Sequence, residues 1–162
     1  MEITGAVIAA VVAIVGLAIT VVTTWAQAEK ETGDLYDQMV RLRVEHPEVM
    51  ALSRRWVPGT FARVYGERRE PEASWVVYYS YVELCLAYCN AVLVARRGWR
   101  MNRSSFNVHH KPLLKLILTE HNPIIEELLK EGKYTSRYIS EFRAQLTAEG
   151  WNWRDEYEKL PT

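Results

Sequence analysis

Apolar residues are most concentrated at the start of the chain, where no charged side chain occurs between Ile3 and Ala28. At a rise of about 1.5 Å per residue, the core of this stretch, which ends near Thr24, is long enough for a helix to cross a hydrocarbon layer of about 30 Å. We therefore predict an N-terminal transmembrane anchor over residues 1–28.

The main alternative is a cleaved signal peptide, because Ala26-Gln27-Ala28 resembles a small-residue cleavage site. The opening residues, MEITG, contain an acid and no Lys or Arg. The apolar run also exceeds the ~7–15 residues usual in signal peptides. The pattern favours an uncleaved anchor.

Basic residues lie on one side of this anchor only. None precedes it, whereas five follow it closely: Lys30, Arg41, Arg43, Arg54 and Arg55. Cytoplasmic flanks of membrane helices carry the excess of Lys and Arg, so we expect the N-terminus outside and the remaining chain on the cytoplasmic side of the inner (cell) membrane. Trp25, at the cytoplasmic end, has the position and chemistry of an interfacial anchor.

Small residues recur along the predicted anchor at spacings that allow close helix packing. They are Gly5, Ala9 and Ala13, followed after a phase shift by Gly16 and Thr20. Two explanations remain open: a packing face for another membrane helix, or the ordinary frequency of Ala and Gly in such helices.

The pattern after the anchor changes to short amphipathic helices. A polar neck at residues 29–34 is followed by apolar positions at helical spacing, Leu35, Met39 and Leu42, and Thr32 or Asp34 can cap the start. Pro47 predicts the end of this helix and the start of another that reaches about Trp56. Residues 57–73, with their Pro and Gly, predict a connecting loop.

The strongest later element is the helix predicted over residues 73–97, which is apolar almost all round and is followed by Gly98 as a stop. Such a helix is either the buried centre of a domain or a second membrane span. Glu83 and five scattered aromatic residues favour the buried centre, because an acid at mid-bilayer costs roughly 2.5–3.5 kcal/mol.

We expect an irregular basic segment over 99–111, a helix after Pro112, another from Asn122-Pro123 to Gly132, and a last helix from about Thr135 to Glu149. The predicted fold is all-α: one N-terminal transmembrane helix and a cytoplasmic bundle of about five helices around the central helix 73–97. The domain would span 35–150, followed by a C-terminal tail at 151–162.

Charge is balanced over the whole chain, with 20 basic and 20 acidic residues, which does not favour a nucleic-acid partner. Locally, no acid lies between Glu83 and Glu120. The candidate contacts there for anionic lipid headgroups, a partner protein or a small anion are Arg96, Arg97, Arg100, Arg103, His109, His110, Lys111 and Lys115. A solvated loop is the other explanation.

Catalytic signatures are missing from the sequence: it has no GxSxG, HExxH, Walker loop, GxGxxG or CxxC. Cys85 and Cys89 share one helix face and are expected as buried thiols. His46 and His121 each follow a predicted helix, where a partly charged imidazole suits the helix dipole. We expect no enzyme, no metal site and no cofactor.

Three stretches, HPEV at 46–49, the helix YYSYVELCLAYCNAVL and the closing KPLLKLILTEHNPIIEELLKEGKYTSRYISEF, resemble a set of small bacterial single-span membrane proteins of unknown function. The resemblance is one of order and spacing across most of the chain. It implies an N-terminal anchor joined to a helical cytosolic domain and implies no activity.

These features predict a non-enzymatic accessory or scaffold subunit of an inner-membrane complex, for which respiratory or photosynthetic assemblies are natural hosts. Its expected partners are other membrane-protein subunits, further copies of itself and anionic lipid headgroups. The alternative is a membrane-tethered sensor or effector that binds an anionic ligand at the basic segment 96–115.

Overall fold

The computed structural model describes residues 2–53, 73–130 and 134–150, and side chains from Val12 onward apart from Pro123 and Lys130. All regular elements in these ranges are helices, as predicted. They are α1 (Glu2–Glu45), α2 (Glu48–Ser53), α4 (Ala73–Arg97), α5 (Arg103–Ser105), the π-helical turn η1 (Phe106–His110), α6 (Lys111–Glu120), α7 (Asn122–Lys130) and α8 (Ser136–Ala148).

The first helix corrects the predicted division into anchor, neck and separate amphipathic helix. α1 runs without a break from Glu2 to Glu45, so the expected neck at 29–34 is helical. Thr32 does not cap a new helix, because its hydroxyl donates to the carbonyl oxygen of Ala28 at 2.9 Å inside the continuous one. The polar stretch contains no Pro, and its charged side chains can face water on one side of a helix while small ones are buried on the other.

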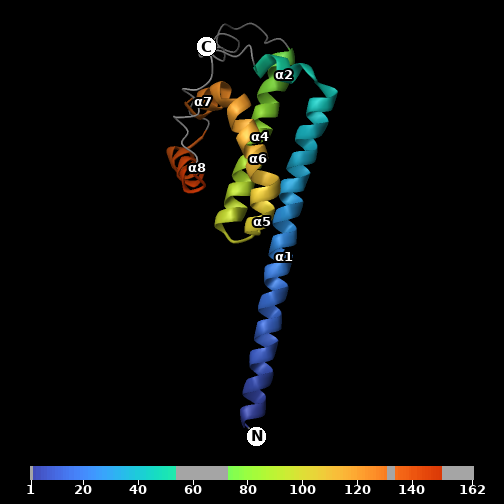
Figure 1. Ribbon diagram of the computed structural model, residues 1–162, viewed down its shortest axis with the longest axis vertical. Coiled ribbons are helices and arrows are strands. Elements are labelled where there is room, and N and C mark those ends of the chain that lie inside the picture. Colours follow the sequence, from blue (N-terminus) through green and yellow to red (C-terminus); the bar gives the residue numbers. More distant parts are fainter. Residues whose placement is uncertain (1, 54–72, 131–133, 151–162) are drawn as a thin grey trace.

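The two halves of α1 have different surroundings. Figure 1 shows the N-terminal half extending away from the bundle as a lone helix, and the C-terminal half beside α4. Apolar side chains from Val12 to Val22 are exposed along the first half. This exposed apolar helix is compatible with a single membrane span or with a signal sequence.

The second half of α1 packs against α4 through a stripe with alternating spacings of three and four residues. The stripe consists of Ala28, Thr32, Leu35, Met39 and Leu42, which are buried or half-buried. This spacing is that of a coiled-coil seam, in which side chains of one helix fill the gaps of the next. Ala28 and Thr32 belong to the stripe although neither has a large apolar side chain.

Helix α4 is the centre of the bundle and runs antiparallel to α1 (Figure 1), with contacts to α1, α2, α7, α8 and η1. More than half of its most apolar window is buried inside the protein (56%), against 6% for α1. Large side chains buried along it include Tyr78, Tyr88, Leu86 and Leu93. Burial of each such side chain contributes about 1.5–3 kcal/mol, so this helix supplies much of the core.

The end of α4 differs in detail from the prediction that Gly98 stops it. Trp99 N–H donates to Arg96 O at 3.3 Å and Arg100 N–H donates to Ala95 O at 2.8 Å, the two bonds of a Schellman motif. The left-handed residue of this motif is Trp99, with φ of 58°. A bulky residue in that conformation costs about 1–2 kcal/mol, which the surrounding contacts must offset.

The segment expected to be irregular between residues 99 and 111 is mostly helical. Asn102 begins it, because its Oδ1 accepts a hydrogen bond from Ser104 N–H at 2.9 Å. The chain then widens into η1, where Lys111 N–H donates to Phe106 O, and continues as α6. Buried Met101 and Phe106 attach this segment to the core.

The remaining described elements agree with the prediction. Pro112 is in the first turn of α6, and α7 begins at Asn122. Thr135 caps α8, accepting from Tyr138 N–H at 3.2 Å, and Gly150 follows the helix with φ of 84°. The predicted loop at 57–73, the end of the helix near Trp56 and the tail at 151–162 lie wholly or almost wholly outside the described residues.

Candidate interaction surfaces

The exposed half of α1 carries the part of the small-residue stripe that the structure describes. Gly16 has no atom within 4 Å of the position that a Cβ would occupy. The Thr20 hydroxyl donates to Gly16 O at 2.9 Å, and the Thr24 hydroxyl donates to Thr20 O at 2.7 Å. These hydroxyls are therefore satisfied within the helix. Ala13 is exposed on the same helix, and the side chains of Gly5 and Ala9 lie outside the described set.

The basic segment does not form one continuous site, because two of its cations bind the end of α8. Arg96 Nε lies 3.5 Å from a Glu149 carboxylate oxygen, an ion pair without an aligned hydrogen bond, and the guanidinium lies 5.8 Å from the centre of the Phe106 ring. Lys111 Nζ donates to the Glu149 carbonyl oxygen at 3.3 Å. Both residues hold α8 on the bundle, which indicates a structural role.

Three other arginines gather around the turn between α4 and α5. Arg97 and Arg103 are exposed and Arg100 is half-buried, with Trp99 between them at 83% exposed. Neither Arg100 nor Arg103 has an ion-pair partner within the described parts of the chain. The pKa of Glu141 on α8 is lowered mainly by its hydrogen bond to Arg137 and to a smaller extent by Arg97.

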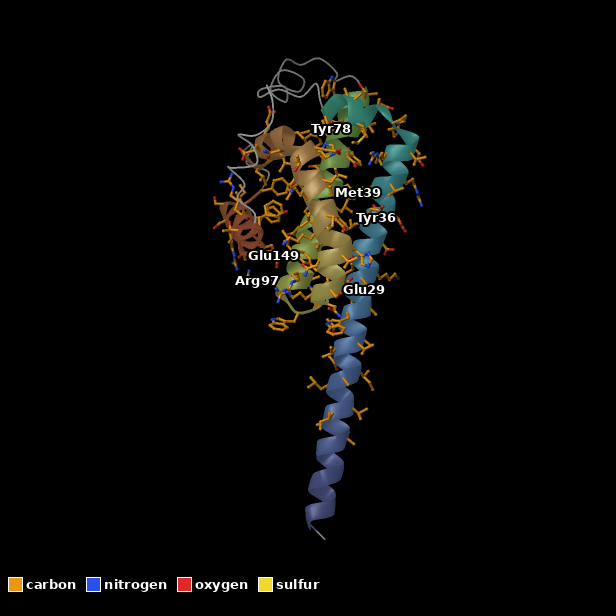
Figure 2. All side chains as sticks on the ribbon, in the orientation of Figure 1. Glu29, Tyr36, Met39, Tyr78, Arg97 and Glu149 are labelled. Atoms are coloured by element: carbon orange, nitrogen blue, oxygen red, sulfur yellow. The ribbon has the colours of Figure 1, made fainter. Side chains whose placement is uncertain are left out.

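This turn is bonded directly to α1. The Trp25 indole Nε1–H donates to the Trp99 carbonyl oxygen at 2.6 Å. Trp25 itself is 38% exposed and follows the exposed apolar run. Figure 2 shows Arg97 and Glu149 at the same end of the bundle as Glu29, with Tyr78 toward the opposite end. The turn therefore faces the side from which the lone half of α1 extends.

His121 overturns the expectation of a partly charged imidazole at a helix end. Its side chain is buried, with Nδ1 3.1 Å from the Tyr78 hydroxyl and its ring edge-on to Tyr81. Burial, and secondarily the charge of Arg43, lowers the pKa of His121 to about 4. The Glu120 carboxylate, 4.0 Å from Nε2, is too distant for a hydrogen bond. His121 is thus a neutral core residue at pH 7.

The remaining histidines have separate environments. His46 Nδ1 lies 3.1 Å from a Glu48 carboxylate oxygen at the surface, just past the end of α1. Half-buried His110 Nδ1 lies 2.8 Å from the Tyr88 hydroxyl, and burial lowers the pKa of His110. His109 is exposed.

A groove of about 790 Å³ lies between α1 and the η1–α6 helix. His109 and His110 line it together with Glu29 and Tyr36 from α1. The Glu29 carboxylate raises the pKa of His110 and so partly offsets the lowering caused by burial. Lys115 lies further along α6, is exposed and does not line this groove. The two histidines and the six cations of the basic segment therefore do not form one site.

Cys85 and Cys89 are buried free thiols, as the sequence predicted. Burial raises the pKa of Cys85 to about 12. At neutral pH the thiol therefore stays protonated and reacts poorly with thiol reagents. Within the described ranges, no three His, Cys, Asp or Glu side chains lie close enough together to hold a metal ion.

No family model, curated protein or solved structure matches this chain.

Proposed function

We propose that this protein is a non-enzymatic, single-pass accessory or scaffold subunit of an inner-membrane protein complex. The observation that carries the proposal is that α1 is one helix with two environments. Its first half exposes apolar side chains from Val12 to Val22, and its second half is part of the bundle core through Ala28 and Met39. Burying the first half in lipid would fix the position and tilt of the bundle at the membrane surface.

Retention of the anchor is supported by the position of the alternative cleavage site. Ala26-Gln27-Ala28 lies inside the continuous helix, and the Ala28 side chain is 2% exposed. Cleavage there would remove the exposed half of α1 and leave the first turn of its packed half as a frayed helix end. Lys30 and Arg41, beyond the apolar half, support a cytoplasmic location for the bundle.

Association with other membrane helices is the second part of the proposal. Ala13, Gly16 and Thr20 leave α1 with little bulk at these positions, and their polar groups need no outside partner. In lipid, helix association depends on close packing of this kind. The partners would be other subunits of the complex or further copies of this chain.

The test is purification of the full chain in a mild detergent after crosslinking in intact cells. We expect a stoichiometric membrane-protein partner, or a defined homo-oligomer, that is lost in Gly16→Ile, where bulk blocks close approach. The matched control is Leu17→Ile, a change of shape at an exposed neighbouring position that keeps the helix apolar. A protein that migrates alone under all these conditions would disprove the subunit role.

A sensor that binds a small anion is the second candidate function. A groove of about 500 Å³ between the end of α4 and α8 is lined by Arg96 and Arg97. Glu141 and Glu149 line the same groove, and Arg96 is already paired with Glu149. These acids would repel an anion, so the groove favours the accessory role over the sensor. Stabilisation of the full chain by inorganic phosphate, lost in Arg97→Gln, would reverse this preference.

A further inference from the structure

We propose that the α4–α5 turn, residues 97–103, is a second membrane contact, in which the Trp99 indole enters the headgroup region and the neighbouring arginines bind anionic lipid headgroups. This inference rests on the proposed anchoring of α1. It gives the bundle a lipid-facing end. It also assigns a role to Trp99, which is not among the contacts predicted for the basic segment.

The depth of the turn follows from one hydrogen bond. Trp25 Nε1 lies 2.6 Å from the Trp99 carbonyl oxygen, so the backbone of Trp99 is at the level of the Trp25 ring. At about 1.5 Å per residue, an α1 span from Ile3 to Thr24 covers a hydrocarbon layer of about 30 Å and leaves Trp25 at the interface. Whatever holds Trp25 at this boundary holds Trp99 there as well.

The conformation of Trp99 directs its side chain away from the protein. The residue has a φ of 58°, and its side chain is 83% exposed while its two backbone groups are bonded to Arg96 and Trp25. A bulky aromatic residue in this backbone region is rare, because glycine occupies it without strain. An indole that presents apolar surface and an N–H group is well suited to the boundary between headgroups and acyl chains.

The charges around Trp99 match an anionic bilayer surface. Arg100 and Arg103 have no ion-pair partner within the described ranges, and Arg97 is exposed beside them. Acids also lie near this end of the bundle. Glu149 is paired with Arg96 and Glu141 with Arg137, whereas Glu29 lies across the groove on α1. Cations within a Debye length of an anionic leaflet are attracted to it.

Site-directed spin labelling of the full chain in lipid vesicles tests the inference. The three labelled variants are Ile19→Cys inside the proposed span, Trp99→Cys at the turn, and Val44→Cys, which is 74% exposed and about 28 Å beyond Trp25 along the helix. Because Cys85 and Cys89 are buried, labelled wild type is the blank. The measured quantity is the accessibility of each label to oxygen, which partitions into lipid, and to a water-soluble nickel chelate.

We expect the Ile19 label to be accessible to oxygen and the Val44 label to nickel, with nickel access at Trp99 several-fold lower than at Val44. A Trp99 label as accessible to nickel as the Val44 label, with Ile19 still in lipid, would overturn the second contact and leave the anchor intact. A water-accessible Ile19 label would instead overturn the anchor. The two failures are therefore distinguishable.

Vesicle composition separates the role of the arginines. Protection of the Trp99 label should increase when phosphatidylglycerol is mixed into phosphatidylcholine, and Arg100→Gln/Arg103→Gln should abolish that increase, whereas Arg41→Gln on the outer face of α1 should not. Equal protection in neutral and anionic vesicles would overturn headgroup binding. The native side chain is checked by quenching with lipids brominated near the headgroup, as the difference in fluorescence between wild type and Trp99→Phe.

Discussion

Helices α1 and α4 are both long and apolar enough to cross a membrane, yet the fold places them in opposite surroundings. The apolar side chains of α1 from Val12 to Val22 are exposed in the described part of the protein, whereas those of α4 are covered by α1, α2, α7, α8 and η1. Composition alone does not separate a membrane helix from a core helix. What separates them is whether other elements of the chain supply matching apolar faces.

The same substitution in both helices should have very different effects on stability. Leu86→Ala in α4 removes a side chain that is 1% exposed and should lower the free energy of unfolding by about 2–5 kcal/mol, because a cavity remains. Leu17→Ala in α1, at 66% exposed, should change it by less than about 0.5 kcal/mol. Denaturant unfolding of the full chain in a mild detergent, followed by circular dichroism, measures both. Equal losses would mean that α1 is packed like α4.

Acid should weaken the core around α4 through His121. The unfolded residue binds its proton near pH 6.5 and the folded one only near pH 4, so between these values the unfolded state binds more protons. The free energy of unfolding should therefore fall by about 3 kcal/mol as the pH falls from about 6.5 to about 4. Above and below that range His121 should cause no further change with pH. Unfolding curves at successive pH values measure this slope.

The control for the acid effect is the pair His121→Gln and His46→Gln. Glutamine at position 121 can still accept from the Tyr78 hydroxyl but does not titrate, so the slope should largely vanish. His46 lies at the surface beside Glu48, and its replacement should leave the slope unchanged. An unchanged slope in His121→Gln would show that other groups cause the acid sensitivity.

The smallest expected effect concerns the bond that joins the two helices. Trp25→Phe keeps an aromatic ring but removes the donor to Trp99 O, which should cost about 1 kcal/mol of stability. Trp99→Phe keeps the backbone acceptor and should cost much less. The same unfolding assay in detergent compares the two. If both variants were equally destabilised, the indole ring contacts and not the hydrogen bond would link the turn to α1.

Much of the fold was predictable because the relevant forces are local. Proline in the first turn of α6, the start of α7 at Asn122 and a last helix close to 135–149 depend on signals within a few residues, and these predictions were confirmed. The burial of Cys85 and Cys89 followed from their apolar surroundings. The interrupted α1 was wrong, because polar residues at 29–34 suggested a loop although nothing there breaks a helix.

The candidate surfaces were less predictable because they depend on contacts between distant segments. Eight residues from Arg96 to Lys115 formed one basic segment in sequence, but Arg96 and Lys111 bind Glu149 on α8 and His110 packs on Tyr88. His121 was expected as a partly charged imidazole at a helix end, but its burial against Tyr78 and Tyr81 lowers its pKa and keeps it neutral. The importance of Trp99 had a single signal, its position after Gly98 among cations.

Local sequence patterns were enough to predict that the chain is helical, that residues 3–24 are apolar enough to span a bilayer, and that 73–97 forms the strongest later helix, because hydrophobic period and helix caps are local properties. The tertiary structure decided which of the two apolar helices is covered by protein. It also decided that the exposed apolar half of α1 continues into the bundle as one unbroken helix, and that Trp25 and Trp99 meet at one level. These outcomes depend on side chains far apart in the chain, whose contacts form only once α1, α4 and α6 are packed together.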